Sequence, residues 1–127
     1  MLKSSSSRRP EVIVEFLLDD ELLFLAVRNI GDAPATRVRV RLEPSIRGLG
    51  GQLDVGGLAL LRRLEFLGPG REIRALVDSL ASYLERQEPR AVSATVSYAD
   101  PRGRRYRATI RHDLAVFSGL PVAVRRS

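Results

Sequence analysis

LLFLAVRNIGDAPATRVRVRL, residues 22–42, is the stretch that decides the fold. Its first arm, 22–27, is apolar throughout, whereas its second arm, 36–42, alternates arginine with valine or leucine. A period of two is typical of a strand that buries one face. Between the arms, residues 29–32 (Asn-Ile-Gly-Asp) tolerate the positive φ of a tight turn, and Pro34 cannot lie inside a paired strand. The stretch therefore predicts a hairpin of two strands.

Alternation and turn residues recur along the chain and predict about seven strands. We expect them at 11–18, 21–29, 36–42, 64–67, 71–78, 91–98 and 104–112. A short helix is expected at 80–86, capped by Asp78 or Ser79. The glycine-rich segment 45–57 predicts a loop with a short edge strand at 52–55, and 58–63 favours a turn or short helix. The predicted fold is all-β, an immunoglobulin-like (fibronectin-III-like) antiparallel β-sandwich of about seven strands with one short helix.

The length of 127 residues suits one domain with a single core. Residues 1–10 hold four serines and three basic side chains, so we expect a disordered tail there. Residues 11–124 then form the domain, and 125–127 form a basic tail. Because the chain has no cysteine and one histidine, disulfides, thiolate chemistry and a multi-histidine metal site are excluded. That histidine, His112, falls on the inward face of the last strand and is expected to pack at the edge of the core.

The net charge of +6 lies mostly at the two ends of the chain. The basic residues there are Lys3, Arg8, Arg9, Arg125 and Arg126. Of the 21 basic residues, sixteen remain within 11–124, against fifteen acidic residues. The expected body is therefore close to neutral, and its composition alone gives no reason to expect nucleic-acid binding.

The turn at 29–35, Asn-Ile-Gly-Asp-Ala-Pro-Ala, and the strand after it resemble those of bacterial immunoglobulin-like modules. The pattern is similar to the cell-adhesion-related domain family and its uncharacterised relatives, which carry Asn-x-Gly-x-x-x-Ala between their second and third strands. Residues 68–72 (Gly-Pro-Gly-Arg-Glu) and 98–103 (Tyr-Ala-Asp-Pro-Arg-Gly) are similar too, so the resemblance covers 11–113 in outline. It implies a β-sandwich that serves as a non-catalytic spacer or binding domain, often in membrane or secreted proteins, and it implies no catalytic residue.

In such a sandwich the third, sixth and seventh strands share a sheet. Their outward residues would form a central row of Ser93, Thr95 and Ser97 with arginines on both sides. The candidate face comprises Arg37, Arg39, Arg41, Arg105, Arg107 and Arg111. This basic trough would fit phosphate, an acidic peptide or a lipid headgroup; the alternative is a solvated sheet face whose arginine stems cover apolar surface. The rows lack aromatic side chains, which argues against nucleic acid as a partner.

The opposite sheet is expected to be apolar on both faces. If Leu23, Leu25 and Val27 face the core, their neighbours face outward and form a candidate interface. That interface comprises Ile13, Leu17, Leu22, Phe24 and Ala26. An exposed apolar face requires cover. The candidates are the chain's own segment 114–124, the short helix near Tyr83, a second subunit or another domain.

Nothing in the sequence pairs a nucleophile with a base, and the neighbouring carboxylates at 19–21 are too few for a calcium site. We therefore expect no enzyme, no cofactor and no metal. The expected function is that of a non-catalytic protein-interaction or structural module. The alternative is a binder of anionic surfaces, which would be membrane headgroups or nucleic acid. The expected partner is a protein. The two faces would also fit a second copy of the chain, in a homodimer, or the periphery of a membrane.

The sequence contains no signal-peptide pattern and no apolar run of the roughly 18 residues that a membrane span needs. We expect a soluble chain, or the soluble part of a membrane-associated protein, in a compartment that the sequence does not specify.

Overall fold

The computed structural model describes residues 8–119, and strands dominate it. The strands are β1 (Val12–Asp19), β2 (Leu22–Asn29), β3 (Ala35–Glu43), β4 (Arg47–Gly48), β5 (Leu53–Asp54), β6 (Leu64–Leu67), β7 (Glu72–Ser79), β8 (Ala91–Ala99) and β9 (Arg105–Asp113). The helices are α2 (Ala59–Arg62) and α3 (Leu80–Glu85), with 3₁₀ turns η1 (Leu49–Gly51), η2 (Val55–Gly57) and η3 (Leu114–Gly119). The prediction of an all-β fold is confirmed, and every long strand lies within about one residue of its predicted bounds.

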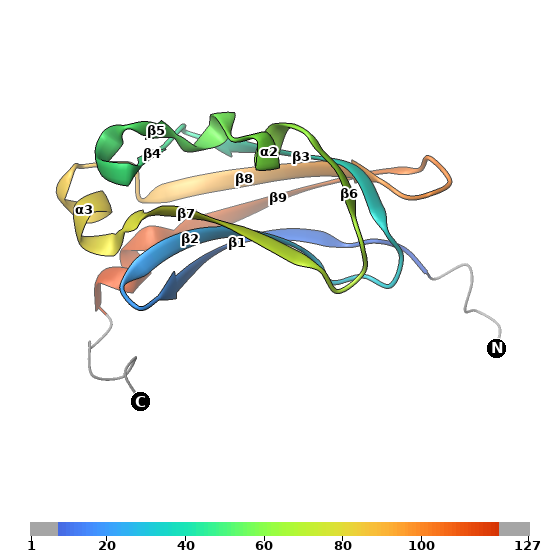
Figure 1. Cartoon of the computed structure of the whole chain (residues 1–127), viewed down its shortest axis with the longest axis horizontal. Helices are drawn as coiled ribbons and strands as arrows, with labels where there is room; N and C mark the ends of the chain where they lie inside the picture. Colours follow the sequence, from blue (N-terminus) through green and yellow to red (C-terminus); the bar gives the residue numbers. More distant parts are fainter. Residues whose placement is uncertain (1–7, 120–127) are drawn as a thin grey trace.

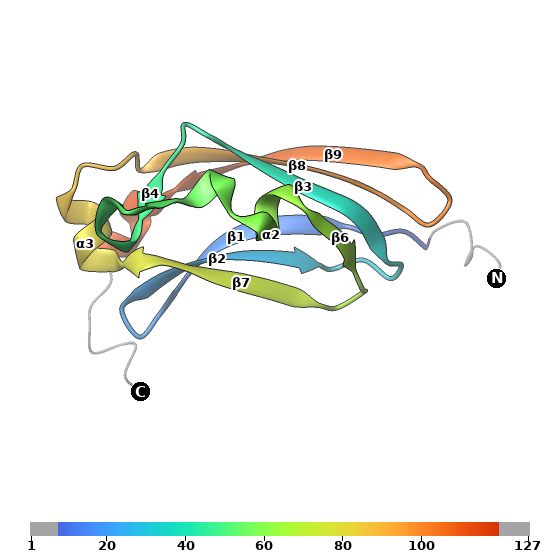
Figure 2. The same ribbon diagram turned by 45° about the horizontal axis from the view of Figure 1, so that its top comes forward.

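Two antiparallel sheets enclose the core. One has the order β1-β2-β7 and the other β6-β3-β8-β9. Figure 1 shows β3, β8 and β9 above β1, β2 and β7, and the same two layers are visible in Figure 2. The inward residues of both sheets, such as Val14, Leu25, Val40 and Val96, form one buried cluster. The period of two therefore predicted these inward side chains, although Ala26, expected to face outward, is also fully buried.

The predicted hairpin at 22–42 is wrong in one respect. Its arms, β2 and β3, are consecutive strands, but they belong to different sheets. β2 pairs with β1 and β7, while β3 pairs with β6 and β8. The turn between them is therefore a crossing from one sheet to the other. Each arm buries its apolar side chains against the facing sheet.

The connection from β3 to β6, residues 44–63, closes one side of the core. β6 pairs only with the start of β3, at Ala35, Thr36 and Val38. Beyond that point α2 and η2 pack beside β3, and Val55 and Leu61 are fully buried. The predicted single helix is corrected here, because α2 is a second one: burial of Leu61 secures a single helical turn that would be marginal alone. The strand predicted at 52–55 is shorter, at Leu53–Asp54, and pairs with β4.

Helix α3 closes one end of the core. Ser79 is its N-cap and accepts a hydrogen bond from the Ser82 N–H at 3.1 Å, which confirms Ser79 rather than Asp78 as the cap. The Tyr83 side chain is fully buried, and its hydroxyl donates to the Pro89 carbonyl. Burial raises the pKa of Tyr83 to about 12. The helix therefore packs Tyr83 into the core while Ala81 and Glu85 stay exposed on its other face.

The buried side chain of Asn29 joins three segments at the opposite end: the start of β1, the turn after β2 and the end of β6. Its Oδ1 accepts hydrogen bonds from the N–H groups of Glu11 at 3.1 Å and Gly31 at 2.9 Å. Its Nδ2 donates to the carbonyls of Ala33 at 2.9 Å and Leu67 at 3.0 Å. These four bonds use both lone-pair positions and both N–H groups of the amide. We call this arrangement the Asn29 corner.

Gly31 is required for close approach and not for positive φ, contrary to the sequence interpretation. The φ angle of Gly31 is not positive. A Cβ at this position would lie 2.3 Å from the Arg9 carbonyl oxygen and 2.5 Å from the Glu11 nitrogen. The turn therefore packs directly on the backbone that enters β1.

The predicted disordered tail, 1–10, included residues that the structure places in the fold. The Arg9 N–H donates to the Asp32 carboxylate at 2.9 Å, and the Asp32 N–H donates to the Arg9 carbonyl at 3.1 Å. Pro10 is buried. The reason is the same close approach, since the turn after β2 supplies backbone partners for these residues. The tail predicted for 125–127 lies outside the described residues.

We predict that Asn29→Ala lowers the free energy of unfolding by about 3 kcal/mol, because it leaves four backbone groups, two of them in buried bonds, without their partner. Urea unfolding monitored by circular dichroism measures the loss. Ile30→Ala is the matched control: Ile30 is 47% exposed, and its truncation should cost less than about 0.5 kcal/mol. Equal unfolding midpoints for the two variants would contradict the role assigned to Asn29.

Candidate functional site

Strand pairing brings the predicted arginine and hydroxyl rows together on the outer face of β3, β8 and β9. Ser97 lies between Arg39 and Arg107 in the register. Thr95 lies between Arg41 and Thr109, and the two threonine Oγ1 atoms are 3.0 Å apart. Hydroxyl side chains thus occupy the central strand, and guanidinium groups rise from the strands beside it.

A groove of about 620 Å³ runs from this face across β3 to the β3–β6 connection. We call it the Arg groove. It is lined by Arg39, Val40, Arg41, Leu42, Ser45, Asp54, Gly56, Leu61, Arg62, Thr95, Ser97 and Arg107. Its volume lies within the roughly 300–1,000 Å³ that is usual for ligand sites. Because β6 pairs only with the start of β3, the connection forms one wall and the sheet face forms the floor.

The Arg groove carries an excess of positive charge. Arg39 is compensated, because its Nη2 lies 2.8 Å from Glu65 Oε2 while Nη1 donates to the Val38 and Leu64 carbonyls at 3.0 and 3.2 Å. Arg41, Arg62 and Arg107 are exposed, and none of them makes an ion pair with another residue of 8–119.

Asp54 is the one acidic residue among those that line the groove. The guanidinium groups can each donate two parallel hydrogen bonds to a carboxylate or phosphate. The arrangement is therefore suited to a ligand with more than one negative charge.

Three predicted arginines lie outside the Arg groove. Arg37 has φ of 50° and sits where the β3–β8 register shifts, so a bulge interrupts the predicted row of alternating arginines. Arg105 lies opposite Ala99 and Arg111 opposite Ser93, nearer the two ends of β9. In their place the groove gains Arg62 and Asp54 from the connection. Sequence analysis missed both, because only tertiary contacts bring 44–63 beside β3.

The predicted apolar interface lies on the outer face of the β1-β2-β7 sheet. In the register, Leu17, Phe24 and Leu76 form one row across the three strands. Leu76, which sequence analysis did not name, is 39% exposed. The apolar face as we define it consists of Ile13, Leu17, Leu22, Phe24, Ala26 and Leu76. Of these, Ala26 is fully buried and the first four are half-buried.

The segments expected to cover this face lie elsewhere, as far as the structure describes them. Helix α3 buries Tyr83 inside the core. Leu114 of η3 is also buried, and its N–H donates to the Arg90 carbonyl at 2.7 Å. The local cover of Phe24 is instead Arg74, whose guanidinium lies 5.5 Å from the centre of the ring. Residues 120–124 of the predicted cover lie outside the described residues.

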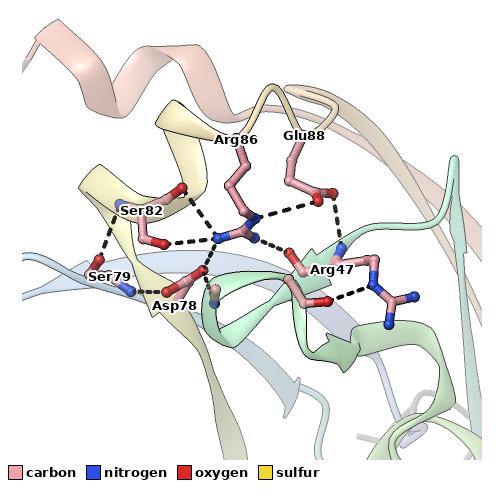
Figure 3. A network of polar contacts seen from close by, with 8 residues as sticks. Arg47, Asp78, Ser79, Ser82, Arg86 and Glu88 are labelled. Atoms are coloured by element: carbon pink, nitrogen blue, oxygen red, sulfur yellow. Dashed lines mark hydrogen bonds and ion pairs between the residues drawn. The ribbon is translucent and has the colours of Figure 1, made fainter.

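A buried ionic network lies at the α3 end of the molecule (Figure 3). Asp78 is 5% exposed, and its Oδ2 accepts from Arg86 Nη1 at 2.6 Å and from the Gly50 N–H at 3.0 Å. Arg86 also donates to the Arg47 carbonyl at 2.7 Å and lies 3.7 Å from Glu88. The Glu88 carboxylate accepts from the Arg47 N–H at 3.0 Å. The network thus ties β7 and α3 to β4 and η1.

This network is structural in character, because its charged groups are taken up by partners within the fold. Burial alone would raise the pKa of the Asp78 carboxyl, but hydrogen bonds from Gly50, Arg86 and Ser79 outweigh it and hold the pKa below its ordinary value. Gly48 lies against β7 in the same region, where a Cβ would be 2.1 Å from the Val77 carbonyl oxygen. The close backbone approach and the ion pair together fix the position of the connection that walls the Arg groove.

His112 packs between β9 and β1, as the sequence predicted. Its ring meets Phe16 edge-on with centroids 5.2 Å apart. Burial lowers the pKa of His112, and the opposing effects of the Val14 backbone and Glu15 do not offset it. Within residues 8–119, no three histidine, cysteine or acidic side chains are grouped as a metal site. No helix of that part of the chain has the length and apolar character to cross a membrane.

We predict that Asp78→Asn costs about 3 kcal/mol of unfolding free energy at pH 7, because Arg86 loses its buried counterion. The pKa of Asp78 is lowered by folding, so its contribution is present above its unfolded pKa of about 3.9 and is lost as pH falls below that value. Urea unfolding between pH 7 and pH 3 should therefore show the gap to the original chain narrowing below about pH 4. Exposed Glu85→Gln is the control, and a gap independent of pH would contradict the prediction.

Comparison with known proteins places the chain in a family without giving a function. Searches of curated proteins and of solved structures each gave no significant match. One family model matches residues 2–118, nearly the whole chain, and its description is "Domain of unknown function". The protein therefore belongs to the DUF8453 family.

Proposed function

We propose that this domain is a non-catalytic interaction module that binds an acidic, extended segment of a protein partner in the Arg groove. The single observation that carries the proposal is the placement of three arginines, Arg41, Arg62 and Arg107, around a hydroxyl-lined floor without acidic partners in 8–119.

The spacing of the arginines supports a peptide. Arg39 and Arg41 are two residues apart on one face of β3, so their Cα atoms are separated by about 6.7 Å. Alternate side chains of an extended peptide have the same spacing, so one carboxylate could pair with Arg41 while the next side chain lies beside Arg39, which Glu65 already holds. No aromatic residue is among those that line the groove, so base stacking gives no reason to favour a single-stranded nucleic acid.

We propose further that the architecture is the fibronectin-III-like variant of the immunoglobulin fold. The support is the strand order. The first, second and fifth long strands form one sheet, while the fourth joins the third, sixth and seventh in the other. Modules of this kind carry binding surfaces on their sheet faces and loops. On this proposal the chain is a bacterial immunoglobulin-like module related to the cell-adhesion-related domains.

The second candidate function is a binder of anionic surfaces. One observation favours it: Arg105 and Arg111 are exposed on the edge strand β9, outside the groove. A surface of headgroups or phosphates would contact these residues together with Arg107, whereas a peptide held in the groove would not need them.

We predict that a fluorescent peptide of alternating glutamate and serine binds the domain, with affinity that falls as salt rises. Arg41→Glu with Arg107→Glu should weaken binding at least tenfold, because two favourable charge contacts become repulsive. Fluorescence anisotropy measures the affinity. Arg105→Glu with Arg111→Glu is the matched control, since it changes the net charge equally outside the groove and should cost less than threefold.

Two further binding experiments distinguish a domain that binds an acidic peptide from one that binds an anionic surface. Vesicles containing phosphatidylserine and a single-stranded oligonucleotide test the anionic surface directly. The domain would be a binder of anionic surfaces, and not of an acidic peptide, on one combined result. The vesicles or the oligonucleotide would bind, and the Arg105/Arg111 double variant would weaken that binding as much as the Arg41/Arg107 double variant does. Peptide binding that is unchanged in the Arg41/Arg107 double variant would contradict the role of the Arg groove.

A further inference from the structure

We propose that the apolar face of the β1-β2-β7 sheet is an interface between two copies of this chain, related by a two-fold axis that runs roughly along β2. This inference is independent of the Arg groove, which lies on the other sheet. It begins with the observation that no strand, helix or loop of residues 8–119 lies over this face in Figures 1 and 2.

The face has a central apolar row and a charged row beside it. The apolar row is Leu17, Phe24 and Leu76, from β1 through β2 to β7. The next row toward the end of β2 is Glu15, Ala26 and Arg74. It therefore carries an acid at one edge of the sheet and a base at the other.

A two-fold axis that runs roughly along β2 makes each of these rows complementary to itself. The operation places β1 of one copy over β7 of the other while keeping each row at the same height. Leu17 then lies over Leu76 of the partner subunit, and Phe24 meets Phe24 of the partner subunit near the axis. Glu15 lies opposite Arg74 of the partner subunit, and the reverse pair forms at the other edge.

The charges select this axis over the alternative. A two-fold axis perpendicular to the strands through Phe24 would place β1 over β1. Glu15 would then face Asp19 of the partner subunit, and like charges in direct opposition are unfavourable. The observed pattern therefore favours the axis along β2.

Individual side chains also fit this arrangement. Glu15 is half-buried and makes no ion pair within 8–119, so a partner's arginine would supply a counterion that the single chain lacks. Arg74 is already positioned, because Glu72 holds its guanidinium at 2.8 Å beside Phe24. Aligned sheets pack at about 30° to one another. Each copy of β2 is therefore inclined by about 15° to the two-fold axis, in opposite senses, so that the strand ends diverge and the two Arg28 side chains, each 3.6 Å from its own Glu72, lie apart.

The size of the face sets the strength of the dimer. Three strands of eight residues present roughly 400 Å² per copy, about half of the ~800 Å² per partner in stable interfaces. We therefore expect a weak, reversible dimer that sedimentation equilibrium detects at high micromolar to millimolar concentration.

The test uses charge exchange at Glu15 and Arg74 in the full chain. Glu15→Arg alone and Arg74→Glu alone should each weaken self-association at least fivefold, because each turns the complementary row into a repulsive one. The double exchange should restore it. An equimolar mixture of the two single variants should associate as strongly as the original chain, since their rows complement each other, although each variant alone associates at least fivefold more weakly.

Control variants test whether a loss of association is specific to the apolar face. Circular dichroism checks that each variant is folded, and Leu76→Glu should abolish association independently of the charged row. Arg111→Glu, on the outer face of the other sheet, should leave it unchanged. A chain that is monomeric at every concentration would overturn the proposal and leave residues 120–127 or a different protein as the cover. Association that persists in both single variants would overturn it equally.

Discussion

The side-chain amide of Asn29 is the interaction on which the rest of the structure depends. It binds the start of β1, the turn after β2 and the end of β6 with four hydrogen bonds, and its own carbonyl accepts from Gly70 at 2.8 Å before β7. Both sheets begin or end at this point, so the amide sets their relative position. A residue without both donors and acceptors would leave buried backbone groups unpaired.

That constraint determines which side chains share a surface. With the sheets held at the Asn29 corner, each strand can turn only one face to the core, and a slip of one residue would exchange the two faces. Arg39, Ser97 and Arg107 therefore align on one outer face, while Leu17, Phe24 and Leu76 align on the other. The molecule presents one basic, concave face and one apolar face, and each suits a different kind of partner.

The sequence predicted the parts of the fold that follow from local pattern. Alternation in β3 and β8, the Ser79 cap and the turn at Asp100 each depend on residues close together in the chain. The Asp100 carboxylate, for example, accepts from the Arg102 and Arg104 N–H groups at 2.9 and 2.8 Å. The wall of the Arg groove could not be predicted in this way, because Arg62 reaches it only through burial of Leu61 and Val55. Nor could the bulge at Arg37, which lies where β3 pairs with β6 on one side and with β8 on the other.

Native-state hydrogen exchange tests the central role of the Asn29 corner most directly. Amides that open only on global unfolding exchange most slowly. We expect the amides of Gly31 and Gly70, although they lie in turns, to exchange as slowly as that of Val96 in the centre of β8. Exchange of these two amides at the intrinsic rate of an unprotected amide, while Val96 stays protected, would contradict this role, because the sheets would then be held together without the corner.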